Sequence, residues 1–88
     1  MQSSLFEKAA GKLETAVEKT NNAAYQARSL DNHTFYGMAE AWREVLQTMG
    51  HSVVLEHHRD GTYIVFERLI INGRTTAEYG SWNGDGWE

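Results

Sequence analysis

Four histidines are the residues of this chain best suited to bind a metal or transfer a proton, but their spacing keeps them apart. His57 and His58 are neighbours in a segment that alternates like a β-strand, so they point to opposite faces. His51 shares a face with His57 but lies about 20 Å away along the segment. The chain has no cysteine and no pair of histidines one helical turn apart. We therefore predict no metal site, and we expect no other cofactor.

Three glutamates, Glu56, Glu67 and Glu78, fall on predicted strands where their carboxylates could meet for acid–base chemistry. A flat sheet face suits such chemistry poorly, because it excludes no water and supplies neither a nucleophile nor oxyanion donors. The sequence also contains no Ser-His-Asp arrangement and no glycine-rich loop that opens a helix. We therefore predict that the protein is not an enzyme.

Arginines supply the groups that would bind a small anion. Arg68 falls on the helix-facing side of a predicted strand, where an unpaired charge is costly. It therefore reaches the rim, pairs with Glu40 or Glu44, or lines a pocket. With Arg74 and Tyr79 it forms the candidate set for an anionic ligand.

The tail, residues 80–88, holds two of the three tryptophans of the chain among glycines and acidic residues. Its composition predicts no regular structure. Trp82 and Trp87 either fold back over the sheet or anchor a partner, because aromatic residues dominate the energetics of interfaces. Asp85 and Glu88 make an anionic ligand less suited to this segment.

Length and charge narrow the classes of function. At 88 residues and 10.0 kDa, the chain is predicted to form one domain, residues 1–88. A formal net charge of −4 argues against a nucleic-acid binder. No apolar run approaches the length of a membrane span, so we expect no membrane partner. The N-terminus lacks the basic start and long apolar stretch of a signal peptide, so we expect a cytoplasmic location.

Two helices are predicted before Gly50, over residues 4–29 and 32–49. The first begins with a capping box formed by Ser4 and Glu7, and the poor helix formers at 20–22 leave a kink near Asn21 open. Gly50 fits a left-handed cap of the second helix. Alanines at seven-residue spacing allow a close helix contact, either with the second helix or with another copy; they are Ala9, Ala16 and Ala23.

A three-stranded meander is predicted over residues 51–79, with strands at 51–58, 62–71 and 74–79. Two dipeptides that favour tight hairpins, Asp60-Gly61 and Asn72-Gly73, separate the strands. The change from helical to strand periodicity near Gly50 predicts an α+β fold in which the helical hairpin packs on one face of the antiparallel meander.

Two-residue turns at both dipeptides assign the strand residues to two faces. Leu55 then faces Phe66, and Glu67 faces Glu78, where like charges repel. The helix-facing side holds Val53, Leu55, Ile64, Phe66, Ile70, Ala77 and Tyr79, and the outer side holds Val54, Tyr63, Val65, Leu69, Ile71, Glu56, Glu67, Glu78 and His58. Apolar residues on an outer face favour an interface with a partner or with a second copy.

In size, acidity and lack of catalytic motifs, the chain resembles the small accessory proteins that phages and other mobile elements encode. Some of those proteins block bacterial defence proteins by binding them, and others sequester signalling nucleotides. The resemblance is to this general kind of protein, and no motif carries it.

Two functions follow as hypotheses, both for a homo-dimer or higher oligomer. The first is a non-catalytic inhibitor that occupies the surface of a partner protein through Trp82, Trp87, Glu56, Glu67, Glu78, Leu69 and Tyr63. The alternative is a protein that sequesters a small anionic signalling molecule, such as a nucleotide, through Arg68, Arg74 and Tyr79.

Overall fold

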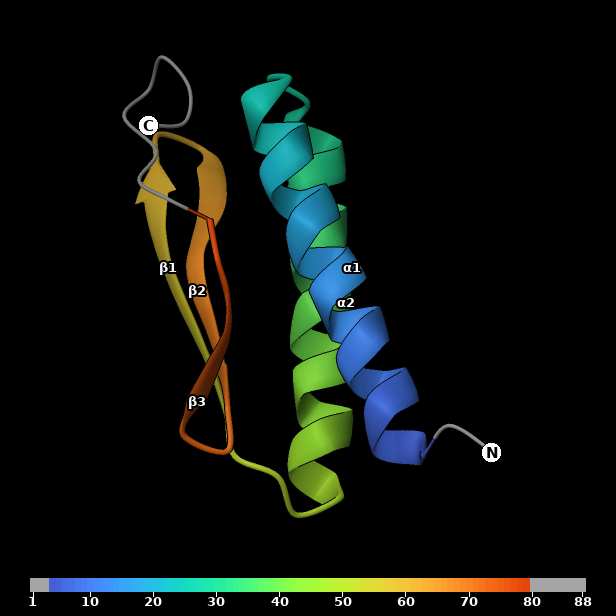
Figure 1. The fold of residues 1–88 in the computed structure, drawn as a ribbon. Coiled ribbons are helices and arrows are strands. Elements are labelled where there is room, and N and C mark those ends of the chain that lie inside the picture. Colours follow the sequence, from blue (N-terminus) through green and yellow to red (C-terminus); the bar gives the residue numbers. More distant parts are fainter. Residues whose placement is uncertain (1–3, 80–88) are drawn as a thin grey trace.

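Two helices lie on one face of a three-stranded antiparallel sheet, which confirms the predicted α+β architecture (Figure 1). The computed structural model describes residues 4–79. Its elements in chain order are α1 (Leu5–Tyr25), α2 (Ser29–Thr48), β1 (Val53–Asp60), β2 (Tyr63–Ile71) and β3 (Arg74–Glu78). The strands lie side by side in the order β1-β2-β3, and the antiparallel pair α1 and α2 forms the second layer.

Helix α1 begins at the predicted capping box and runs unbroken to Tyr25. The hydroxyl of Ser4 accepts a hydrogen bond from the amide of Glu7 at 3.0 Å, and the Glu7 carboxylate accepts one from the amide of Ser4 at 3.3 Å. There is no break near Asn21. The helix ends four residues before the predicted boundary because Ala27 adopts a φ of 59°, and the amide of Arg28 then donates to the Ala23 carbonyl.

Helix α2 begins at Ser29, earlier than the predicted start at residue 32. Asp31 is part of its first turn and accepts a hydrogen bond from Nε of Arg28 at 2.7 Å. Asn32, a residue type that favours N-cap positions, is fully buried inside the helix. At the other end, Gly50 takes the predicted left-handed conformation with a φ of 97°.

The alanines at seven-residue spacing make their contacts within a single chain. Ala9, Ala16 and Ala23 are all buried, and Ala9 and Ala16 pack in the core with Ala39 of α2. Small side chains let the two helices approach closely, so this stripe is the contact between α1 and α2. It therefore gives no support to the predicted seam between two copies.

The two hairpin turns differ in how closely they follow the prediction. Asn72 and Gly73 both have positive φ, at 54° and 79°, which is the geometry expected for an Asn-Gly turn. In the other hairpin Asp60 pairs with Tyr63, so the two turn residues are Gly61 and Thr62 rather than Asp60 and Gly61. The predicted pairing of Leu55 with Phe66 is wrong, because His57 pairs with Phe66.

A β-bulge in β2 changes which residues face the helices. Glu56 pairs with Arg68 and His57 pairs with Phe66, which leaves Glu67 as the extra residue. The alternation of side chains therefore shifts by one at this point. Before the bulge Phe66 faces the helices, and after it Leu69 and Ile71 do.

This shift corrects the predicted faces. Leu69 is 1% exposed and belongs to the core, and so does Ile71. Arg68 and Ile70 move to the outer face. A second irregularity leaves Thr76 unpaired in β3, so Arg68, and not Glu67, lies opposite Glu78. The predicted repulsion between Glu67 and Glu78 across the strands is therefore wrong.

Two buried asparagines attach the helices to β2. The side chain of Asn21 donates to the Phe66 carbonyl at 2.9 Å and accepts from the Phe66 amide at 2.8 Å. Asn32 donates to the Ile64 carbonyl at 2.8 Å and accepts from the Ile64 amide at 2.9 Å. The ladder between β2 and β3 reaches only from Ile71 to Arg68, so these side-chain amides bond to β2 where β3 has ended.

Candidate functional site

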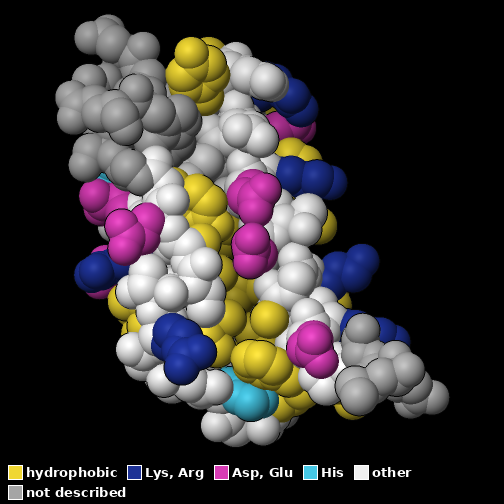
Figure 2. Space-filling model, in the orientation of Figure 1, with side chains coloured by type: hydrophobic (Ala, Val, Ile, Leu, Met, Phe, Trp, Pro, Cys, Tyr) yellow, Lys and Arg dark blue, Asp and Glu magenta, His cyan; other side chains and the backbone are white. Residues whose placement is uncertain are grey.

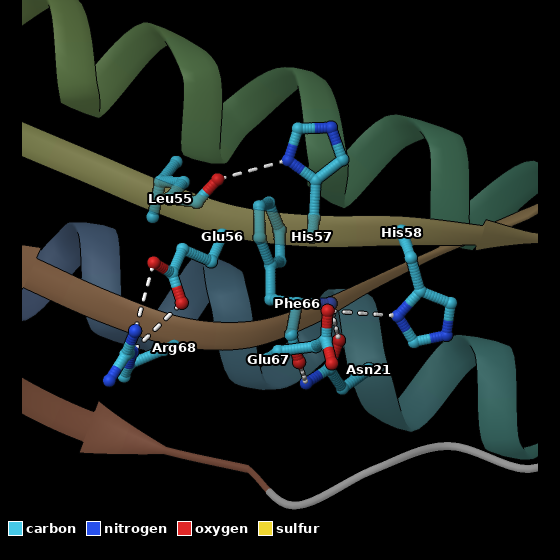
Figure 3. A network of polar contacts seen from close by, with 8 residues as sticks. All are labelled: Asn21, Leu55, Glu56, His57, His58, Phe66, Glu67 and Arg68. Carbon is cyan, nitrogen blue, oxygen red and sulfur yellow. Dashed lines mark hydrogen bonds and ion pairs between the residues drawn. The ribbon is translucent and has the colours of Figure 1, made fainter.

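The outer face of the sheet carries a network of ion pairs (Figure 3). Arg68 of β2 donates from Nε to Oε1 of Glu56 at 2.8 Å and from Nη2 to Oε2 at 3.0 Å. The bulge directs the Glu67 side chain toward His58, whose Nδ1 lies 3.4 Å from Oε1 of Glu67. The four side chains remain partly exposed to solvent.

The bidentate pair shifts the pKa values of both Glu56 and Arg68. The hydrogen bond from Arg68 holds the pKa of the Glu56 carboxyl below its usual value of 4.5. The same bond raises the pKa of Arg68, and the nearby charges of Glu78 and Glu67 raise it further. The three predicted glutamates thus do gather on the outer face, but around a guanidinium that offsets their charge. This arrangement gives no carboxylate pair for acid–base chemistry.

The apolar part of the predicted partner surface is much reduced. Leu69 lies in the core and is removed from the candidate site. Tyr63 is half-buried at the start of β2. Among the apolar residues predicted for this face, Val54 is 45% exposed, whereas Val65 is buried. Trp82, Trp87, Asp85 and Glu88 lie outside the described residues.

The three residues predicted for an anionic ligand are not brought together. Arg68 is engaged by Glu56, and Arg74 lies beyond the Asn72-Gly73 turn beside an open cavity of about 380 Å³ with Phe6 and Thr76. Tyr79 packs against the core, and its hydroxyl has no hydrogen-bond partner within residues 4–79. Burial raises the pKa of Tyr79, and the carboxylates of Glu18 and Glu14 raise it further. An anion would therefore meet acidic groups at Tyr79.

The histidines occupy separate places in the structure. His51 packs against Phe6, with ring centroids 4.3 Å apart, and His57 packs against Tyr36 at 5.6 Å. His33 contacts the Thr62 carbonyl. Within the part of the chain that the structure describes, no three histidine or acidic side chains are placed to hold a metal ion. In the same range no helix is long and apolar enough to cross a membrane.

An apolar depression lies on the helical hairpin, between the start of α1 and the end of α2. We call it the hairpin groove; it has a volume of about 350 Å³ and is lined by Leu5, Lys8, Ala9, Lys12, Trp42, Val45 and Met49. At about 100° per residue, Lys12 lies about 180° around α1 from Asn21, and Val45 lies about 180° around α2 from Tyr36. Asn21 and Tyr36 contact the sheet, so the groove is on the side of the hairpin turned away from it.

Exposed apolar residues surround this groove. Leu5 is 74% exposed, Met38 44%, Val45 41% and Met49 40%. The groove was not predicted from the sequence, although the width of the apolar stripe on residues 32–49 was a signal for it. That stripe contains Phe35, Met38, Ala39, Trp42, Val45, Leu46 and Met49, and the structure fully buries only Ala39 and Leu46. When an apolar stripe is wider than the contact that a helix makes within its own chain, some of its side chains stay exposed and are available for a second contact.

Comparisons with family models, with curated proteins and with solved structures give no significant match.

Proposed function

We propose that the protein is a non-catalytic binding domain that acts by occupying the surface of a partner protein through the hairpin groove. The observation that carries the proposal is the cluster of large apolar side chains left exposed on one side of the hairpin. A patch of this kind on a small domain favours protein contact. Methionine suits such a surface because its flexible side chain adapts to the shape of a partner.

The groove also has the features of an interface core. Trp42 and Ala9 form its floor and already pack against the hydrophobic core, so a bound side chain would meet a rigid base. Leu5, Val45 and Met49 surround this floor and would lose their exposed area on binding. A partly buried tryptophan beneath a ring of smaller apolar side chains resembles the arrangement of binding hot spots.

Inhibition by occupancy is the effect that we propose, in keeping with the general resemblance to accessory proteins of phages and mobile elements. Self-association has less support, because two observations that favoured it have another explanation. The alanine stripe, Leu69 and Ile71 all pack in the core of a single chain. Sequestration of an anionic ligand also has less support, because Arg68 is engaged by Glu56 and Tyr79 lies near the carboxylates of Glu18 and Glu14.

Two valines of similar exposure provide a matched test. Val45 lines the groove and is 41% exposed, whereas Val54 lies on the outer sheet face and is 45% exposed. Three tagged chains would be expressed in cells that naturally produce the protein, then cross-linked and purified: wild type, Val45→Asp and Val54→Asp. Captured proteins would be identified by mass spectrometry, and each candidate would be purified for calorimetry with the three chains.

We expect a purified partner that binds wild type and Val54→Asp and loses at least tenfold in affinity to Val45→Asp, because a desolvated carboxylate costs about 1.4 kcal/mol or more. Circular dichroism would show that both variants remain folded. If no partner depends on Val45, or if Val54→Asp alone abolishes binding, the groove is not the binding surface.

A further inference from the structure

Charged residues are sorted to opposite sides of α1. Lys8 and Lys12 line the hairpin groove, and Nζ of Lys19 lies 5.5 Å from the ring centroid of Phe35 on the same side of the hairpin. The carboxylates of Glu14 and Glu18 lie on the other side, near Tyr79. Figure 2 shows this division, with acidic side chains on the side of α1 next to the sheet and basic side chains along its opposite edge.

Within residues 4–79, no ion pair joins the three lysines to an acidic side chain. The ion pairs of residues 4–79 are formed by arginines and by His58, and none includes Lys8, Lys12 or Lys19. The lysines therefore form a basic row along one wall of an apolar surface. The wall of the groove on α2 is formed by Trp42, Val45 and Met49, which span about 10 Å or two helical turns, and Phe35 lies about two turns farther back along the same helix.

A second copy that packs its own groove on this one through a two-fold axis does not complement the basic row. In α2 the exposed positions next to the apolar stripe hold Thr34, Ala41 and Thr48, which carry no charge. A two-fold partner would therefore place the lysines of each copy against neutral residues or against one another. Glu40 is turned away from this side and pairs with Arg43 at 2.6 Å.

Resting on the proposed function, we infer that the hairpin groove binds an amphipathic helix of a partner protein, with a row of acidic residues on the flank that lies along α1. The apolar side chains of the groove extend for about two turns of α2 and accept the apolar stripe of a helix, as in other helix-in-groove contacts. Lys8 and Lys12 are one turn apart and Lys19 follows two turns later, so carboxylates spaced i, i+4 and i+11 on a partner helix that runs parallel to α1 meet all three.

Synthetic peptides with one shared leucine stripe test this inference on the full chain. The first carries glutamate at i, i+4 and i+11 along one flank, the second carries glutamine there, and the third carries lysine. Fluorescence anisotropy would measure their affinities for wild type, for Lys8→Glu/Lys12→Glu, and for Arg59→Glu/Arg74→Glu. The last variant makes the same change in net charge away from the groove.

We expect the glutamate peptide to bind wild type about tenfold more tightly than the glutamine peptide, and the lysine peptide to bind most weakly, because three exposed ion pairs act together. Lys8→Glu/Lys12→Glu should reverse this order, Arg59→Glu/Arg74→Glu should keep it, and added salt should reduce it. Val45→Asp should weaken all three peptides.

Two outcomes overturn the inference while leaving the proposed function standing. In the first, the peptides bind equally well and all depend on Val45, so that the groove selects for apolar contact alone. In the second, no peptide binds although a purified partner does so through Val45. Light scattering gives a third outcome: a dimer that Val45→Asp dissociates would show that a second copy covers the groove, and it would overturn both proposals.

Discussion

Replacing Asn32 by alanine should destabilise the protein strongly, because this one side chain makes several buried hydrogen bonds. Asn32 is fully buried and makes three hydrogen bonds to backbone groups, two of them to the amide and carbonyl of Ile64. The third partner, the Thr20 carbonyl, lies inside α1 and keeps its helical partner. The substitution therefore leaves the two groups of Ile64 unpaired.

Each buried, unpaired backbone group costs about 1–3 kcal/mol, and water that enters the space left by the amide recovers part of this. We expect a loss of about 2–4 kcal/mol in the free energy of unfolding. A domain of this length has a total stability of about 4–13 kcal/mol, so the loss is a large fraction of it. With an m-value near 1.5 kcal/mol/M, a loss of 3 kcal/mol lowers the urea midpoint by about 2 M.

Equilibrium urea unfolding followed by circular dichroism measures this change, and Asn22→Ala is the matched control. Asn22 is an exposed residue of α1, so its replacement changes helix propensity but removes no buried hydrogen bond. Asn32→Asp separates shape from hydrogen bonding, because it turns an oxygen toward the carbonyls of Thr20 and Ile64. It should lose at least as much as Asn32→Ala. A free energy of unfolding for Asn32→Ala within about 0.5 kcal/mol of that for Asn22→Ala would refute the reasoning.

Two further changes test the local geometry. Ala27→Gly should raise the free energy of unfolding by about 1 kcal/mol, because Ala27 has a φ of 59° that glycine adopts without strain; a thermal melt measures it, and a lower melting temperature would contradict it. Glu56→Gln should lower stability at neutral pH and not in acid. Its folded pKa lies below the value of 4.5, so the contribution of the Glu56 carboxylate is present above pH 4.5 and is lost as the pH falls through the folded pKa. Urea midpoints of wild type and Glu56→Gln should therefore converge on acidification, and a constant gap from pH 7 to about 3 would count against the pairing with Arg68.

Local signals in the sequence were enough to predict the order and type of the elements. The capping box at Ser4, the glycine at position 50 and the Asn72-Gly73 turn each act over a few residues, and the structure confirms all three. The start of α2 was placed too late because Asp31 and Asn32 are good capping residues. Asn32 instead serves a contact with β2, 32 residues away in sequence.

The faces of the sheet could not be assigned from alternation alone, because a bulge is selected by packing against the helices. The sequence does contain one sign of this bulge. In β2 two polar residues, Glu67 and Arg68, stand together between apolar residues, whereas a regular strand would separate them. This single shift explains why Leu69 was placed in the candidate site and Arg68 in the core. The buried role of Asn21 had no comparable signal, since asparagine in a helix predicts only weak propensity.

The attachment of Asn21 and Asn32 to β2 also bears on how this protein avoids aggregation. A strand with unpaired backbone groups is a template for another chain, and β2 extends past the end of β3. The two side-chain amides occupy that stretch, so the helices protect the strand as well as covering its face. Along β1, one of the two edge strands of the described sheet, the protection is of another kind, a succession of charged or ionisable residues from Glu56 to Asp60. A substitution that detaches the helices would therefore expose an aggregation-prone strand edge together with the core. Misfolded chains would then pair through β2 first.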